Sequence, residues 1–345
     1  MNGIEGCYTA LVTPMKENRE IDEEGLRQLI EFQAKNKVDG ILAVGTTGES
    51  ATLDWEEHDH VIQFVKEHLG SRGITIGGTG SNNAEETVRG TEHAADIGVE
   101  AVLLVDPYYN GPSSLEIRRE YLEPIAKGFP DIQVIPYVIP GRSGTQLYPQ
   151  DLAVLSAQYE NIRSVKEATG DMDNIRRTRE LCGEDFDILS GDDGLNFELM
   201  SDPDVSASGA ISVASNVAPG AVGELIRCIL DGEIERARQL DSSLRPLFDL
   251  VTVKTTEQTP YGPVLCRARN PLPYKTLMNI LGMPSGSSRP PLGKMTLNGT
   301  NHVLETARQV YDNDPEILEP VEEFFDVDLG ERLYRDDILE GLHYD

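Results

Sequence analysis

Lys166 has the residue type and the position to act as a nucleophile. It ends the short β-like run 161–165 and stands just before a helical pattern, in the stretch Ser-Val-Lys-Glu-Ala-Thr-Gly. A lysine at the carboxyl end of a strand in a repeated strand–helix unit points into the mouth of a barrel. There a partly desolvated amine loses its proton near neutral pH and attacks a carbonyl to form a Schiff base. A surface lysine that begins a helix would have the same spacing, so other segments must decide.

Two further segments carry groups that would serve such an amine. The loop 45–50, Gly-Thr-Thr-Gly-Glu-Ser, lets backbone N–H groups converge on a small carboxylate, while Thr46 and Thr47 add hydroxyls for donation and proton relay. Tyr137 ends an expected strand, where a phenol can shuttle protons. Arg142 follows in a Pro/Gly-rich turn and offers a planar fork for a carboxylate. A flexible loop, core packing of Tyr137 and a loop salt bridge of Arg142 are the alternative interpretations.

One further motif has two interpretations, and two others argue against a dinucleotide site and a metal site. The stretch 106–112, Asp-Pro-Tyr-Tyr-Asn-Gly-Pro, either packs its tyrosines or brings a phenol to the barrel mouth. The glycines of 77–80 lack the third glycine and the acidic residue of a dinucleotide site. His58 and His60 stand two residues apart on a helical pattern, which separates their rings and argues against a metal site. The combined groups suit imine formation on a 2-oxo acid, which requires no metal or organic cofactor.

The elements that must position these groups alternate with a period of about 30 residues. Helical patterns at 23–34, 55–69 and 84–97 follow residues suited to N-caps. Eight strand–helix units predict a closed (β/α)₈ TIM barrel over residues 1–225, with a doubly wound sheet as the competitor. The expected strands are 7–13, 40–44, 75–78, 101–105, 133–137, 162–166, 187–189 and 208–213.

The sequence beyond the barrel predicts two more regions. Helical patterns at 232–253 and 273–281 indicate a C-terminal helical region over 226–296. Residues 297–345 form an acidic extension, with a further helical pattern at 302–311, that holds 14 Asp and Glu against 3 Arg. Because its end still contains Leu, Ile, Phe and Tyr, we expect this extension to dock on the rest of the protein.

The amino-acid composition indicates which binding partners are unsuitable and in which cellular compartment the protein works. A net charge of −29 argues against nucleic acid or an anionic membrane as a partner, and with few lysines it resembles cytoplasmic proteins of halophiles. No apolar run is long enough to cross a membrane, and no signal peptide is visible. Four scattered cysteines indicate reduced thiols, so we expect a cytoplasmic protein.

The motifs together resemble one enzyme family. The chain is similar, from about residue 6 to 296, to the pyruvate-dependent family that includes dihydrodipicolinate synthase and N-acetylneuraminate lyase. The resemblance rests on segments 9–14, 45–53, 107–110, 137–144, 166–170, 190–193 and 209–213. It implies a homotetramer built as a dimer of dimers, with pyruvate and an aldehyde as substrates.

The resemblance also assigns roles to individual residues. Lys166 would form the Schiff base with pyruvate, and Thr47, Tyr137 and Tyr109 would relay protons, with Tyr109 reaching across a dimer interface. The substrate-binding residues would be Thr46, Thr47, Arg142, Gly191 and Ile211, where Arg142 binds the carboxylate of the aldehyde. A lysine feedback site would comprise Ser50, Ala51, His58, Asn82, Glu86 and Tyr108. Trp55 stands where inhibited members often have histidine, which argues against inhibition by lysine.

Three functions compete on this basis. The first is condensation of pyruvate with L-aspartate 4-semialdehyde to 4-hydroxy-tetrahydrodipicolinate, in lysine and diaminopimelate biosynthesis. The second is cleavage of 2-keto-3-deoxygluconate to pyruvate and glyceraldehyde. Arg142 favours the first, because an aldehyde with a carboxylate needs a cation and a sugar aldehyde does not; Tyr109 favours it too. The third, a non-catalytic ligand-binding barrel, is disfavoured by the complete set of reactive side chains.

Overall fold

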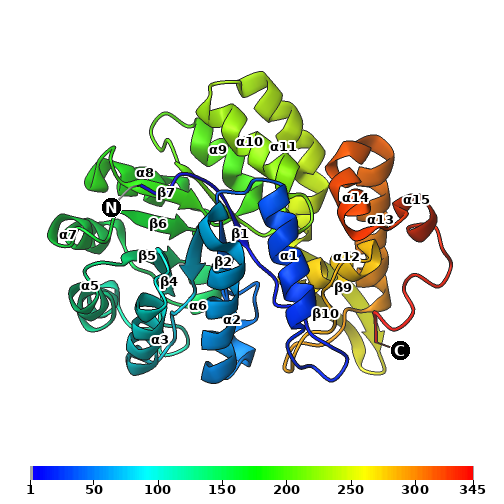
Figure 1. Ribbon diagram of the computed structural model, residues 1–345, viewed down its shortest axis with the longest axis horizontal. Helices are drawn as coiled ribbons and strands as arrows, with labels where there is room; N and C mark the ends of the chain where they lie inside the picture. The colour runs from blue at the N-terminus through cyan, green and yellow to red at the C-terminus, as the bar shows by residue number, and fades with distance from the viewer. Residues whose placement is uncertain (1–2, 345) are drawn as a thin grey trace.

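The computed structural model describes residues 3–344, and their centre is a closed barrel of eight parallel strands in chain order, in which β1 pairs with both β2 and β8. Helices surround the strands (Figure 1). This confirms the predicted TIM barrel. The strands are β1 Gly6–Ala10, β2 Gly40–Ala43, β3 Ile74–Gly77, β4 Ala101–Val105, β5 Gln133–Val138, β6 Ser164–Glu167, β7 Asp187–Ser190 and β8 Gly209–Ser212.

Side-chain caps begin the first three long helices where the sequence predicted them. The Asp22 side chain accepts a hydrogen bond from the N–H of Gly25 at 3.1 Å. The Asn83 side chain accepts one from the N–H of Glu85 at 3.0 Å. Asp54 and Glu57 form a reciprocal capping box. The helices of the barrel are α1 Glu23–Lys35, α2 Trp55–Leu69, α3 Ala84–Asp96, α4 Ser114–Glu116, α5 Glu123–Gly128, α6 Pro140–Ser143, α7 Pro149–Gln158, α8 Met172–Cys182, α9 Asn196–Ser201 and α10 Pro219–Leu230, with a π-helix at Ile117–Leu122 between α4 and α5.

The hydrophobic core lies inside the barrel and between its strands and helices. Strands β1, β2, β5, β6 and β8 are buried at every residue, as expected for parallel strands covered on both faces. Their carboxyl ends therefore share one rim, where the loops that follow each strand can place polar groups.

The region after the barrel differs from the helical prediction. Helix α10 continues past residue 225 to Leu230, and α11 Ile234–Phe248 ends before the predicted limit of residue 253. An antiparallel hairpin follows, with β9 Thr252–Thr259 and β10 Gly262–Arg269. The β-branched residues that begin β9 and the Thr-Pro-Tyr-Gly turn favour this hairpin over a longer helix. The remaining helices are α12 Leu272–Leu281, α13 Leu297–Asn313, α14 Glu319–Phe325 and α15 Leu329–Arg332.

The acidic extension docks, as its apolar residues predicted. Leu318, Val321 and Leu329 are fully buried. The ring of Phe32 on α1 lies 5.3 Å from that of Phe324 and 5.2 Å from that of Phe325. In Figure 1, α13 and α14 stand at the edge of the barrel beside α12. Among the described residues, no helix is both long and apolar enough to cross a membrane.

Candidate active site

The Lys166 amine and the Tyr137 ring meet at the carboxyl-end rim of the barrel. Their residues are register partners on β6 and β5, so both side chains project to the same face of the sheet. The Lys166 Nζ lies 4.3 Å from the centre of the Tyr137 ring. Both side chains are buried, with 4% and 5% of their surface exposed. The strand register therefore supplies the contact between amine and phenol that the sequence predicted.

Burial tunes both groups for proton transfer. Loss of hydration lowers the pKa of Lys166 from 10.5 to about 7, Asp193 opposes this shift, and Arg142 adds to it. A large share of the amine is then neutral at pH 7 and able to attack a carbonyl. Burial also raises the pKa of Tyr137 to about 12. The positive charge of Arg142 lowers this pKa, and the negative charge of Asp192 raises it further. The phenol therefore keeps its proton and can donate it.

Thr47 stands opposite these groups on the loop after β2. Its side chain is buried, and its Oγ1 accepts a hydrogen bond of 2.9 Å from Asn270 Nδ2. Asn270 Oδ1 is buried without a hydrogen-bond partner. An unsatisfied acceptor of this kind is costly. Asn270 lines the same cavity as Lys166, where a ligand with a hydrogen-bond donor would satisfy it.

A buried ion pair fixes the same loop. Glu49 adopts a left-handed backbone conformation with φ of 59°. Its Oε1 lies 2.6 Å from Lys275 Nζ, and both side chains are at most 1% exposed. Lys275 also donates to the carbonyls of Thr13 and Ser287 at 3.2 and 3.1 Å, so each hydrogen of its ammonium has an acceptor. The loop is thus held to α12 rather than flexible.

Arg142 reaches the same rim from a short helical turn. Pro140 begins α6 and Gly144 ends it with φ of 74°, which is the usual placement of these residues at helix ends. The Arg142 Nη2 donates to the carbonyl of Asn270 at 3.1 Å. Burial lowers the pKa of Arg142, although it remains a cation at any pH relevant here.

A cavity of about 230 Å³ unites most of the predicted site. Its lining includes Lys166, Tyr137, Thr46, Thr47, Arg142 and Gly191. A Cβ at Gly191 would lie 3.1 Å from Lys166 Cε and 3.0 Å from Ala168 Cβ, so glycine leaves room for the lysine side chain. Ile211 is buried in β8 outside this lining, and Val213 reaches the cavity instead.

Tyr109 is not brought to the cavity of its own chain. Its side chain is 91% exposed, and its backbone has φ of 79°, which is strained for a residue with a Cβ. Its N–H donates to the carbonyl of Ser143 at 3.2 Å, which ties this conformation to the loop of Arg142. The tyrosine is thus held outward.

The residues of the expected lysine site divide between a cavity and the interior. Ser50, Ala51 and Tyr108 line a second cavity of about 530 Å³ that shares Arg142 with the first. His58 is buried with its ring centre 4.5 Å from that of Trp55, and burial lowers its pKa to about 4. Glu86 accepts a hydrogen bond of 2.6 Å from Ser81, and Asn82 is exposed.

Several residues around the site were not predicted from the sequence. Asp193 is buried, and its Oδ2 accepts the N–H groups of Val213 and Ala214, each at 2.8 Å. Arg269 and Asn270, at the end of the unpredicted hairpin, line the Lys166 cavity. The Ser-Gly-Asp-Asp stretch was a local signal for Asp193, whereas the hairpin residues had none.

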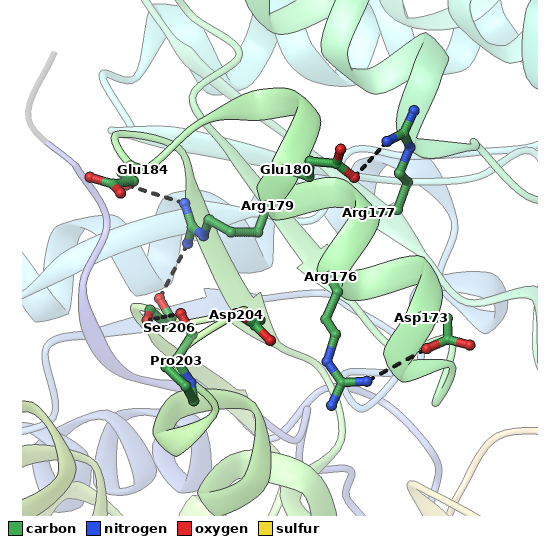
Figure 2. A pocket seen from close by; sticks show the side chains of 9 residues that line it. All are labelled: Asp173, Arg176, Arg177, Arg179, Glu180, Glu184, Pro203, Asp204 and Ser206. Atoms are coloured by element: carbon green, nitrogen blue, oxygen red, sulfur yellow. Dashed lines mark hydrogen bonds and ion pairs between the residues drawn. The ribbon is translucent and has the colours of Figure 1, made fainter.

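A larger surface hollow of about 710 Å³ lies away from this chemistry. It is built on α8 and on the segment that precedes β8, and it shares no lining residue with the Lys166 cavity. Figure 2 shows its arginines engaged locally: Arg177 pairs with Glu180, and Arg179 donates to backbone carbonyls. These cations are already neutralised or hydrogen-bonded. Across residues 3–344, no group of three His, Cys, Asp or Glu side chains is arranged to hold a metal ion.

Comparison with known proteins identifies the family. Residues 3–310 match the Dihydrodipicolinate synthetase family. The chain belongs to this family. A 4-hydroxy-tetrahydrodipicolinate synthase of Geotalea daltonii is 36% identical over 306 residues, which cover 89% of this chain and 98% of that protein.

Solved structures of the family agree with the fold. A dihydrodipicolinate synthase from Aquifex aeolicus superposes with a TM-score of 0.81 at 38% identity, over 92% of this chain and all of that one. The enzyme from Cyanidioschyzon merolae with lysine bound gives a TM-score of 0.80 at 31% identity, over 89% of this chain and 98% of that one. Members of the family thus share the barrel, and the acidic end beyond residue 310 lies outside the family match.

Proposed function

We propose that the protein is a 4-hydroxy-tetrahydrodipicolinate synthase, which condenses pyruvate with L-aspartate 4-semialdehyde in lysine and diaminopimelate biosynthesis. The observation that carries this proposal is the buried Lys166 amine, with its pKa lowered to about 7 and its Nζ 4.3 Å from the Tyr137 ring centre. The names of its relatives, at 36–40% identity, support the same activity.

Lys166 is the nucleophile of the proposed reaction. Its neutral amine attacks C2 of pyruvate, and the carbinolamine loses water to give an iminium ion. Loss of a proton from C3 then gives an enamine whose C3 attacks the aldehyde carbon. The amino group of the second substrate finally attacks C2 and releases Lys166, so the lysine is regenerated and no redox step is required.

The surrounding groups move protons and bind carboxylates. Tyr137 keeps its proton near neutral pH and donates it as the carbinolamine loses water, with Thr47 as the next member of the relay. Thr46 and Thr47 bind the carboxylate of pyruvate, while Gly191 and Val213, which stands two residues beyond the expected Ile211, complete its pocket. Arg142, at the outer part of the cavity, binds the carboxylate of the semialdehyde.

Tyr109 completes the relay of a second subunit in this proposal, within a homotetramer. Its exposure and its constrained, outward backbone support this role. Mixing Tyr109→Phe with Lys166→Ala subunits tests it, because a hybrid dimer contains one site with both residues intact. We expect activity to return on subunit exchange; a monomer in light scattering, or mixtures as inactive as their parts, would contradict it.

The large negative charge supports a protein adapted to a cytoplasm with a high salt concentration. The four cysteines are free, which fits a reducing compartment.

The aldehyde decides between the candidate reactions. The purified protein is incubated with pyruvate and L-aspartate 4-semialdehyde, and loss of both substrates is followed. A parallel reaction contains 2-keto-3-deoxygluconate alone, and release of pyruvate is measured. We expect turnover in the first reaction only. Turnover of ketodeoxygluconate without condensation would overturn the proposed function, and no adduct with pyruvate would favour a binding protein.

A further inference from the structure

The hairpin β9–β10 delivers one of its own side chains to the mouth of the active site. Arg269 is the last residue of β10 and pairs with Thr252, the first residue of β9. Both residues line the Lys166 cavity together with Val251 and Asn270. The base of the hairpin therefore forms part of the cavity wall, while its turn extends away to the fully exposed Tyr261. In Figure 1, β9 and β10 lie beside α12, next to the barrel.

Arg269 and Arg142 are held together by a reciprocal pair of hydrogen bonds. The Arg142 Nη2 donates to the carbonyl of Asn270 at 3.1 Å, next to Arg269. The Arg269 Nη1 donates to the carbonyl of Gly141 at 3.4 Å, next to Arg142. Each guanidinium thus reaches the backbone beside the other. The second bond is long and exposed, so it leaves most of the Arg269 donors free for a ligand.

Neither of the two cations takes part in an ion pair within residues 3–344. The nearest candidate in the cavity lining, Asp192, forms no ion pair with either arginine, and its Oδ1 accepts the N–H of Gly194 at 3.1 Å. Arg269 also disfavours the charge on Arg142, since it lowers the pKa of that guanidinium. In a chain with a net charge of −29, two adjacent unpaired arginines are unusual. An anion bound between them would relieve this repulsion.

We propose that Arg269 is a specificity-determining residue, which with Arg142 clamps the carboxylate of the incoming aldehyde between two guanidinium groups. This inference rests on the proposed function and adds to it a residue from the hairpin. Pyruvate, which sits deeper at Lys166 and the threonine loop, does not need this clamp. Arg269 therefore contributes to selection of a carboxylate-bearing aldehyde over a neutral one.

The test compares Arg269→Gln with the wild-type protein in steady-state kinetics. Glutamine keeps an N–H donor for Gly141 and removes the positive charge. We expect KM for aspartate semialdehyde to rise about ten- to hundredfold, the usual value of a charged hydrogen bond, with little change in kcat or in KM for pyruvate. The matched control is Arg163→Gln, which removes the same charge from an exposed position just before β6, outside the lining of both cavities. We expect the control to change KM less than about threefold.

Two further measurements separate charge from structure. Borohydride trapping of pyruvate should remain complete in Arg269→Gln, which shows an intact Lys166 site. Arg269→Lys, which keeps the charge without the planar fork, should recover part of the lost affinity. Equal rises in both KM values, an unchanged KM for the semialdehyde, or the same effect in Arg163→Gln would overturn the inference. A wild-type protein that does not condense the semialdehyde would instead overturn the proposed function.

Discussion

Replacing Lys166 by methionine should stabilise the fold while it abolishes activity. The substitution keeps an unbranched side chain in the cavity and removes an amine that burial makes costly to charge. The lowering of its pKa from 10.5 to about 7 corresponds to about 5 kcal/mol, at about 1.4 kcal/mol for each pH unit. This is the upper limit of the free energy that the folded protein loses by keeping the ammonium buried.

The sign of the effect follows from the two protonation states. Below pH 7, Lys166 is charged in both the folded and the unfolded chain, so folding bears the full cost. Between pH 7 and 10.5 the folded chain binds fewer protons than the unfolded one, and its stability rises with pH. The advantage of Lys166→Met is then about 5 kcal/mol below pH 7, about 3 kcal/mol at pH 8.5 and close to zero above pH 10.5.

Urea unfolding at several pH values, with fixed salt and protein concentration, measures this difference. Lys254→Met, on the exposed face of the hairpin, is the matched control and should show no comparable gain. A variant that is no more stable than wild type at pH 6.5 would refute the reasoning. So would an advantage that does not shrink as the pH rises, because the amine would then not be desolvated in the folded protein.

Three other predictions concern the relay, the loop and the charge. Tyr137→Phe keeps the ring over Lys166 and removes the proton, so kcat should fall about 10²–10³-fold while pyruvate is still trapped; near-normal turnover would exclude the phenol from the relay. Lys275→Met leaves the buried Glu49 carboxylate without its cation, although its Oε2 still accepts the N–H of Arg289. Denaturant unfolding should show a loss of about 3–5 kcal/mol, partly recovered when Glu49→Gln is added; no recovery would contradict the ion pair as the cause. The midpoint of thermal unfolding should rise between about 0.1 and 1 M KCl, because the Debye length falls from about 10 to about 3 Å, and a constant midpoint would contradict salt adaptation.

The barrel and its central groups could be predicted from the sequence because their signals are local. Each strand is a short apolar run, and the chemistry of a barrel lies at the carboxyl ends of its strands. Lys166 and Tyr137 stand near the carboxyl ends of such runs and Thr47 just after one, so the closed strand order is enough to bring them to one rim.

Residues brought in by the rest of the chain had no such signal. The predicted helical pattern of α11 was extended to Val253, so the hairpin was missed and with it Arg269. The pairing of Glu49 with Lys275 joins positions 226 residues apart, and nothing near either residue marks it. Tyr109 was expected to reach across a dimer interface; its outward position depends on a backbone φ of 79°, which periodicity does not specify.

The central claim is that Lys166 forms a Schiff base with pyruvate, and reductive trapping tests it directly. The full-length protein is treated with borohydride in the presence and absence of pyruvate, digested with trypsin and examined by mass spectrometry. We predict that pyruvate adds the mass of one reduced pyruvyl group to the peptide 164–176, at Lys166, and that activity is lost in proportion. An unmodified Lys166 with activity intact, or an adduct on another lysine, would contradict the account.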